Sequence, residues 1–378
     1  MKFIIMRRLP KYLQLYAVGV TILCLVMSCN TENKKNEQNS LPKKDLEQKL
    51  FTSLTQEESG VDFENLLIES AESNYYQYMY SYIGGGVAAE DFNNDGLIDL
   101  FFTSNSQNNR LYLNKGNFKF EDITEKANFK ETISFNTGVT TVDINNDGYI
   151  DIYVGRGGAD ETQFANLLYV NNGDLTFTER AKEYGLDDDN RAINSVFFDF
   201  DNDNDLDVYI SNTPDMTSNI DVLDLDEIAK DPKTIALKGS DKLYRNNGDG
   251  TFEDISIEAG ILPDRGFGLN VEVGDLNNDG WLDVYVNNDF IIPDFVYLNT
   301  GKGTFKESRN EVLKHMSFNS MGGDIADVNN DGYLDLLTLD MNPEDYVRSK
   351  TTMAMTSMNQ FELMVRSNYH HQYVHNML

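Results

Sequence analysis

The sequence predicts an all-β fold built from one repeated unit of four strands. A nine-residue acidic pattern occurs five times, and a hairpin signature follows four of the copies. Successive copies begin 52, 56, 76 and 52 residues apart. Short β-like apolar runs flank each acidic stretch, which should therefore form the bend between two strands. Four strands in about 50 residues is the size of one blade of a β-propeller, so we expect a partial propeller of about five blades.

The acidic pattern gathers oxygen atoms in a short loop. Positions 1, 3, 5 and 9 are always Asp or Asn, and position 8 is always apolar. Position 6 is Gly in four copies and Asn204 in the third, which suits a backbone turn with positive φ. Ca²⁺ prefers six to eight oxygen ligands at about 2.3–2.6 Å and tolerates the irregular geometry of a loop. The copies are Asp91–Asp99, Asp143–Asp151, Asp199–Asp207, Asp275–Asp283 and Asp327–Asp335.

We expect each loop to hold one Ca²⁺, which makes about five sites. The ligands would be the side chains at positions 1, 3, 5 and 9 and the backbone carbonyl at position 7, where the side chain varies freely. The expected ligands are Asp91, Asn93, Asp95, Leu97 and Asp99; Asp143, Asn145, Asp147, Tyr149 and Asp151; Asp199, Asp201, Asp203, Asp205 and Asp207; Asp275, Asn277, Asp279, Trp281 and Asp283; Asp327, Asn329, Asp331, Tyr333 and Asp335.

Two other interpretations of these loops can be compared with this one. Asp, Asn and Gly all favour turns, so a single copy could be an ordinary turn, whereas five copies in one register favour a common ligand. An EF-hand requires a bidentate Glu at position 12 and flanking helices. Position 12 carries no Glu in any copy, which excludes an EF-hand. The residues there are Phe102, Val154, Ile210, Val286 and Thr338.

The chain is strongly acidic. Its 31 basic and 62 acidic residues give a net charge of −31. Sixteen of the carboxylates lie at side-chain ligand positions of the five loops, where they repel one another unless cations neutralise them. No basic face is visible, so nucleic-acid binding is disfavoured.

The first residues are predicted to be a targeting segment. Basic residues precede the apolar run Leu13–Met27, which is too short for a comfortable membrane span. The run ends in Val26-Met27-Ser28-Cys29, which resembles a bacterial lipobox and implies cleavage before Cys29 and lipidation there. Residues 1–28 are therefore expected to be a lipoprotein signal peptide and residues 29–48 a flexible tether. The alternative is an ordinary secretory signal with an incidental Cys29.

These signals predict an exported lipoprotein at the outer membrane or cell surface of a Gram-negative bacterium, with its membrane anchor at Cys29. The only other cysteine, Cys24, lies in the segment to be removed. No disulfide is therefore expected in the mature chain.

Residues 49–378 form the predicted propeller region. An Asn-x-Gly turn lies between alternating aromatic strands in Leu168–Phe177 and again in Val296–Phe305, which is a strong hairpin signal. The interval of 76 residues indicates an insertion near Thr213–Asp241, with a short helical pattern around Val222–Ala229.

A helical insertion is predicted over residues 342–366, with Asn342 as its N-cap and Pro343 in its first turn. Its Met-rich face could bind a partner or pack on the propeller. His371 and His375 stand at i, i+4, which would suit a transition-metal site, although no further ligand set is evident.

Both ends of the propeller region carry strand-like stretches. The final Asn376–Leu378 resembles Asn109–Leu111, which opens a hairpin strand. The fifth unit is therefore expected to be incomplete and the chain to be truncated at its C-terminus. Val61–Leu66 resembles the last strand of the first unit, Phe118–Ile123, and is predicted to be a strand awaiting a further blade.

The loops, with Phe and Gly before them and Asn-x-Gly-x-x-Phe after them, resemble FG-GAP/VCBS repeats. Those repeats are the blades of integrin-α-type β-propellers, and the resemblance implies loops that bind Ca²⁺. The wider sequence is similar to bacterial lipoproteins of the ASPIC/UnbV family, related to the animal cartilage acidic proteins. The resemblance covers roughly residues 50–378 and departs from the pattern at Asn204, while Asp201 adds a carboxylate.

The predicted function is binding, by a Ca²⁺-stabilised, membrane-tethered extracellular module for protein or glycan partners. One alternative is a propeller-type carbohydrate-active enzyme, and another is a structural spacer for a missing C-terminal domain. No catalytic residue and no cofactor besides Ca²⁺ are predicted. The loop carboxylates are assigned to Ca²⁺, and no nucleophile elbow, metalloprotease helix or phosphate loop occurs, so we expect no enzyme.

Overall fold

The computed structural model describes residues 51–71, 73–129, 134–159, 164–214, 222–234, 238–351 and 357–378. The chain divides into two compact units, Met1–Ser53 and Leu54–Leu378, and the second contains all the repeats. The predicted signal peptide, the tether and Cys29 lie outside the described residues. Among the residues that are described, no helix has the length and apolar character needed to cross a membrane.

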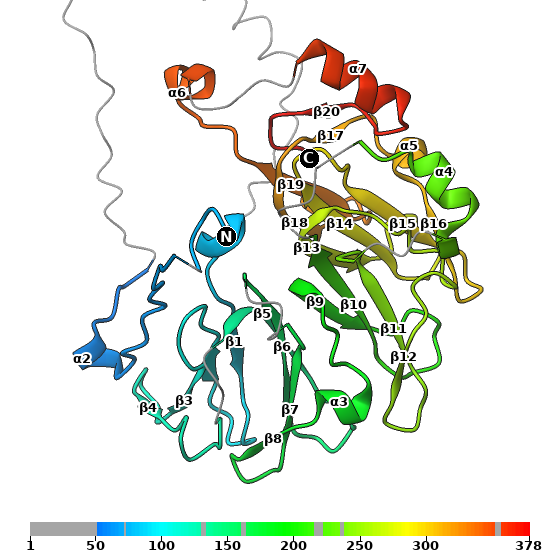
Figure 1. Ribbon diagram of the computed structural model, residues 1–378. Helices are drawn as coiled ribbons and strands as arrows, with labels where there is room; N and C mark the ends of the chain where they lie inside the picture. Colours follow the sequence, from blue (N-terminus) through cyan, green and yellow to red (C-terminus); the bar gives the residue numbers. More distant parts are fainter. Residues whose placement is uncertain are drawn as a thin grey trace, which may run out of the picture. The chain divides into compact units, whose positions relative to one another are not determined.

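Four antiparallel sheets of four strands follow one another along the second unit, each with its strands in sequence order (Figure 1). The first blade contains β1 Val87–Glu90, β2 Asp99–Phe102, β3 Arg110–Asn114 and β4 Phe120–Asp122. The second contains β5 Phe135–Val142, β6 Asp151–Gly157, β7 Leu167–Asn171 and β8 Phe177–Glu179. The third contains β9 Arg191–Phe198, β10 Asp207–Thr213, β11 Lys242–Asn246 and β12 Phe252–Asp254. The fourth contains β13 Phe267–Gly274, β14 Asp283–Asp289, β15 Phe295–Asn299 and β16 Phe305–Glu307.

The first strands of successive blades lie beside one another. β1 contacts β5, β5 contacts β9, β9 contacts β13, and β13 contacts β18 (Ser320–Ala326) of a fifth unit. The strands approach so closely that a Cβ atom on Gly138 would lie 2.4 Å from the carbonyl oxygen of Ile193. Side chains also link the blades: the Thr103 hydroxyl donates to the carbonyl of Thr137, and the Thr137 hydroxyl to that of Ala192, both at 2.6 Å. The predicted all-β propeller of four-stranded blades is confirmed.

Apolar side chains fill the space between neighbouring blades. The second strand of a blade is buried on both faces, and Ile152, Tyr153 and Val154 are all fully buried. Phe129, which follows the first blade, packs its ring 5.0 Å from that of Phe177 in the second. Each fully buried side chain of this size contributes about 1.5–3 kcal/mol to folding. Blade-to-blade packing therefore supplies the main stabilising term of the unit.

The fifth unit contains β18 and β19 (Asp335–Asp340), which pair in the register of the other first and second strands. The backbone N–H of Asp340 donates to the Asn376 side chain at 2.8 Å, as Ser104 N–H donates to Asn109 at 3.0 Å. Met377 then pairs with Thr338. Met377 thus bridges Thr338 in the register in which Arg110 pairs with Phe102, as the resemblance to Asn109–Leu111 predicts, although residues 376–378 form no assigned strand.

Short α-helices and 3-10 helices lie outside the four-stranded sheets. They are α2 Gln56–Ser59, η1 Met79–Tyr82, α3 Ala181–Tyr184, α4 Leu225–Lys230, η3 Pro232–Thr234 and α5 Arg309–Val312. α4 lies within the predicted helical pattern of the insertion. A two-stranded parallel pair joins β17 Met316–Ser317 to β20 Gln372–Tyr373.

The predicted helical insertion is present, but as two described helices, α6 Tyr346–Thr351 and α7 Met358–Arg366, with residues 352–356 outside the description. The expected N-cap at Asn342 is wrong, because the Asp345 carboxylate instead accepts a hydrogen bond from Arg348 N–H at 2.8 Å. Met364 of α7 is buried in the apolar core that the third and fourth blades share. This contact supports an insertion packed on the propeller.

The predicted strand at Val61–Leu66 is wrong, because this segment forms no strand. It lies instead against the first blade. The Phe63 ring stacks on that of Phe102 at 4.9 Å, and the Tyr112 hydroxyl donates to the Asp62 carboxylate at 2.6 Å. These side-chain contacts with the first blade hold the segment in place without β-pairing.

We predict that Asp294→Asn flattens the pH dependence of stability. Burial raises the pKa of the Asp294 carboxyl to about 7, although Tyr285 O–H and Asn288 N–H donate to it. The pKa of an unfolded Asp is about 3.9. Between these values the folded chain binds more protons than the unfolded chain, so the free energy of unfolding falls as pH rises. The substitution removes this loss, and Tm should fall less from about pH 5 to pH 8 than in the wild type.

An amide fits this position, since Asn166 occupies it in the second blade and donates to the Tyr153 hydroxyl at 3.0 Å. Asp189→Asn is the matched control, because it removes the same charge from an exposed side chain. Thermal unfolding across the pH range should show the control following the wild type. Parallel curves for wild type and Asp294→Asn would contradict the prediction.

Candidate metal-binding loops

The five acidic loops share one backbone conformation. Position 6 has a positive φ in every copy, and Asn204 (φ 73°) adopts the conformation of Gly96 (φ 86°). The departure from Gly in the third loop is therefore accommodated. Position 4 also lies in the left-handed region, at φ between 55° and 61°. It is Asn in every copy: Asn94, Asn146, Asn202, Asn278 and Asn330. The sequence analysis missed this regularity, although Asn is the side chain that best tolerates such a backbone after Gly.

The first Asp of each loop organises the turn. Asp91 accepts hydrogen bonds from the backbone N–H groups of Asp95 at 3.0 Å and Gly96 at 2.7 Å. Asp95 in turn accepts from Leu97 N–H at 2.8 Å. The same bonds recur in the other four loops. The carboxylates of positions 1 and 5 are thereby held over the concave side of the turn.

The ninth residue joins the loop to the rest of its blade. Asp151 is fully buried and accepts hydrogen bonds from Ile144 N–H within the loop and Asn171 N–H on the third strand, at 3.0 and 2.7 Å. Burial raises its pKa to about 6, and that of Asp207 in the third blade to about 7. In the fifth unit Asp335 accepts from Val328 N–H at 3.1 Å, and the description includes no residue in the place of Asn171.

The third loop has the strongest cation-binding character among the described residues. Asp199, Asp201 and Asp207 each place one carboxylate oxygen within 4.8 Å of the others. Oδ1 of Asp201 is buried and has no hydrogen-bond partner. In the first two loops the residue at this position is Asn, whose amide donates to the position 5 carboxylate at 3.0 and 2.9 Å. An Asp cannot make that bond, so a divalent cation fits the orphaned oxygen and the all-oxygen donor set.

The side chain at position 7 has a packing role, contrary to the expectation that only its carbonyl matters. A Cβ atom on Gly301 would lie 2.8 Å from Nε1 of Trp281, and one on Gly173 would lie 3.0 Å from the Tyr149 ring. These aromatic rings therefore cover the glycine of the hairpin turn in their own blade. Only Gly at the turn allows the ring to approach so closely.

In the second and fourth blades a buried Asn clamps the loop to its hairpin, and the sequence analysis assigned this Asn to the turn alone. The Asn171 amide donates to the carbonyl of Ile150 in its own loop at 3.1 Å and to that of Phe92 in the preceding loop at 2.9 Å. Its side-chain oxygen accepts from Gly173 N–H at 3.0 Å. Asn299 makes the corresponding bonds to Leu282, Gly301 and, across the blade boundary, Phe200. The repeated Asn-x-Gly was the available signal.

The histidines do not gather into a metal site within the described part of the chain. The Nε2 atom of His370 lies 3.0 Å from the carbonyl oxygen of Leu313. His375 stacks on Tyr373, with ring centroids 6.3 Å apart. The acidic cluster of the third loop is the group of possible ligands found among the described residues.

Sequence comparisons identify the repeats. The FG-GAP-like repeat family matches residues 91–154, 234–286 and 292–338. Cartilage acidic protein 1 of Xenopus tropicalis is 25% identical over 245 residues, which cover 63% of this chain and 34% of that protein. The human protein is 24% identical over 208 residues, covering 54% of this chain and 28% of its own length. Three stretches of the chain therefore match the FG-GAP-like repeat model, and the chain spans about a third of the length of the cartilage acidic protein 1 sequences that it matches.

Two solved structures are similar at a lower level. An Agrocybe aegerita lectin, described as recognising non-reducing terminal N-acetylglucosamine, has a TM-score of 0.40 and 20% identity, covering 68% of this chain and 61% of its own. The V. cholerae biofilm matrix protein Bap1 has a TM-score of 0.37 and 11% identity, covering 68% of this chain and 35% of its own. Similarities of this size say nothing about what the present chain binds.

We predict that Asn171→Ala destabilises the protein by about 2–3 kcal/mol, because it leaves two carbonyls and one N–H group buried without their partner. Asn172→Ala is a matched control one residue away, since the Asn172 amide is exposed and bonds only to Thr176 and Thr178. Denaturant unfolding should place the control within about 0.5 kcal/mol of the wild type. Equal losses in the two variants would show that the clamp contributes nothing.

Proposed function

We propose that this chain is a Ca²⁺-stabilised propeller that serves as an extracellular binding module. The observation that carries the metal assignment is the third loop, where clustered carboxylates surround the buried, unpartnered oxygen of Asp201. The other four loops have the same backbone and the same hydrogen bonds, so the proposal extends to all five. The matching FG-GAP-like repeats support it.

The proposed Ca²⁺ ions would stabilise the folded blades. The loops connect the first and second strands, and these strands pack against the neighbouring blades. Like charges at the loop positions repel in the metal-free chain, and a bound Ca²⁺ would neutralise part of that charge. Buried Asp151 and its counterparts would transmit the rigidity of each loop to the hairpin beside it.

A binding role follows from what the scaffold offers. The blades are fixed by repeated interactions, whereas the insertions between them vary in length and carry exposed side chains. Scaffolds of this kind place function in the variable segments. Protein and glycan partners both suit the proposal. A spacer that presents a further domain is the second candidate, since the relatives extend over about three times the matched length.

The sequence also supports a proposal about the N-terminal segment. The lipobox-like Cys29 favours export and attachment to the outer membrane or cell surface. Labelling of cells with a radioactive fatty acid, compared between wild type and Cys29→Ser, tests the anchor. Equal labelling of both proteins would refute it.

We predict that Ca²⁺ raises Tm by several degrees over a chelator, and that Mg²⁺ at the same concentration has a much smaller effect. Each site adds about 1.4 kcal/mol at ten times its Kd, if only the folded chain binds. Asp201→Asn should reduce the Ca²⁺-dependent rise, since it removes a loop-three carboxylate. Asp189→Asn, with one charge removed outside the loops, should respond like the wild type.

Differential scanning fluorimetry of the three proteins measures these shifts, and circular dichroism confirms that each one is folded. A folded wild type whose Tm ignores Ca²⁺ would mean that the loops are ordinary turns. An equal response of Asp201→Asn and wild type would remove loop three from the assignment.

A further inference from the structure

Four of the five repeat units have a β-bulge at the same repeat position of their first strand. The pairing between first and second strands skips Thr137 and Gly138 in the second blade, Ile193 in the third, Leu269 in the fourth and Met321 in the fifth. Such β-bulges leave the extra residue outside the regular ladder and redirect its side chain. All four bulges fall six residues before the first Asp of the loop, where the first blade has Gly85.

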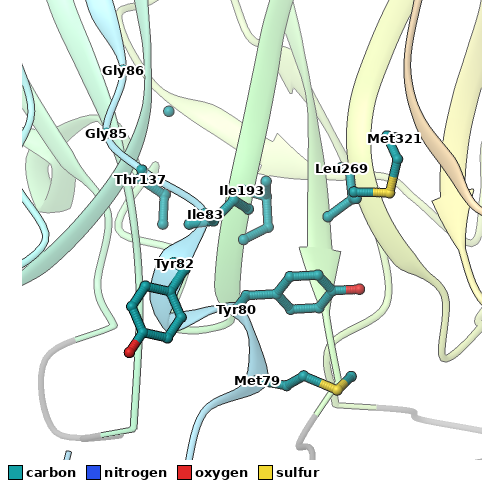
Figure 2. Close-up of a pocket in the computed structure, with 12 residues that line it drawn as sticks. Met79, Tyr80, Tyr82, Ile83, Gly85, Gly86, Thr137, Ile193, Leu269 and Met321 are labelled. Carbon is teal, nitrogen blue, oxygen red and sulfur yellow. The ribbon is translucent and has the colours of Figure 1, made fainter. Parts of the chain in front are cut away.

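These residues line one cavity of about 480 Å³ (Figure 2). Thr137, Ile193, Leu269 and Met321 contribute one side chain from each of four blades. The first blade contributes the backbone of Gly85, where a Cβ atom would lie 2.2 Å from the Thr103 carbonyl oxygen. No side chain fits at that place, so the first blade lines the cavity there with its backbone. Because the innermost strands lie in sequence order, the cavity lies on the axis around which the blades are arranged.

The segment around η1 forms another wall of the cavity and is firmly held. The Tyr80 hydroxyl donates to the Asp289 carboxylate of the fourth blade at 3.0 Å. Its ring packs against Phe267, with centroids 5.7 Å apart. Tyr78 contacts Phe135 of the second blade edge to face, at 5.2 Å. Tyr80 and Ile83 therefore remain in place as part of a formed pocket.

The lining has an uncharged and mainly apolar character. Among the described residues, no Asp, Glu, Lys, Arg or His lines the cavity. Its hydroxyl groups are engaged elsewhere: Thr137 donates to Ala192, Tyr80 to Asp289 and Tyr82 to Glu69. Water inside such a cavity finds few partners, so its replacement by an apolar group is favourable. The volume lies within the 300–1,000 Å³ typical of ligand pockets.

We propose that this axial cavity binds an uncharged, apolar small molecule with a ring or a short hydrocarbon chain. The strongly negative net charge disfavours anions, and no carboxylate of the described residues lines the cavity to pair with a cation. The pocket uses none of the loop residues, so the proposal stands apart from cation binding. It gives the propeller a ligand site that all five repeat units build together.

Fluorescence titration with Nile red, an uncharged apolar dye, tests the proposal on the full chain in Ca²⁺. The wild type should bind one dye saturably. Leu269→Trp and Met321→Trp each fill the cavity from a different blade and should weaken binding at least tenfold. We use two variants in case one of them does not fold. Met321 is 39% exposed, so its substitution is better tolerated than that of a buried residue. Thermal unfolding checks that each variant is folded.

Phe361→Ala is the control for binding elsewhere. Phe361 lines a second cavity of about 510 Å³, formed with Phe318, Tyr373 and neighbouring residues. This variant should bind Nile red like the wild type. The proposal is overturned if the wild type binds no dye, if dye binding does not saturate, if both Trp variants retain wild-type affinity, or if Phe361→Ala alone loses binding.

Discussion

The buried carboxylate at the ninth loop position is the contact on which each blade depends. In the second blade, Asp151 ends the acidic loop, begins the second strand and accepts N–H groups from the loop and from the third strand. One side chain thus connects the acidic turn to the hairpin. A carboxylate fully removed from water is costly unless its oxygens are hydrogen-bonded. These bonds make its burial possible, and they fix the loop in one conformation.

Two substitutions in the third loop depart from the repeat pattern, and each has a visible structural consequence. Asn204 replaces the loop Gly and takes the same backbone conformation. Asp201 replaces the Asn that donates to its neighbour in the first two loops, and its buried oxygen is left without a partner. The third loop therefore has the most carboxylates of the five, and it lacks the amide hydrogen bond to position 5 that the first two loops contain. Of the five loops, it would gain most from the cation that we propose.

Much of the fold and of the candidate site could be predicted, because both rest on short-range patterns repeated four or five times along the chain. The acidic turns and the Asn-x-Gly hairpins involve neighbours in the chain, and the structure contains them. The failures lie where a contact from another element changes a local preference. Val61–Leu66 has the pattern of a strand, yet Phe63 stacks on the first blade. Asn171 reads as a turn residue, yet its amide reaches Phe92 in the preceding blade.

The sequence by itself determined the unit, its spacing, and the oxygen-rich loop, since periodicity and turn chemistry are local properties. Only the tertiary structure decided how the units cooperate. Thr137, Ile193, Leu269 and Met321 share no residue type, and their common position at a bulge becomes visible only when the strands are paired. Tyr80 meets Asp289 across 209 residues of sequence. The axial cavity arises from such long-range packing. The side chains that line it come together in space although their residue types differ.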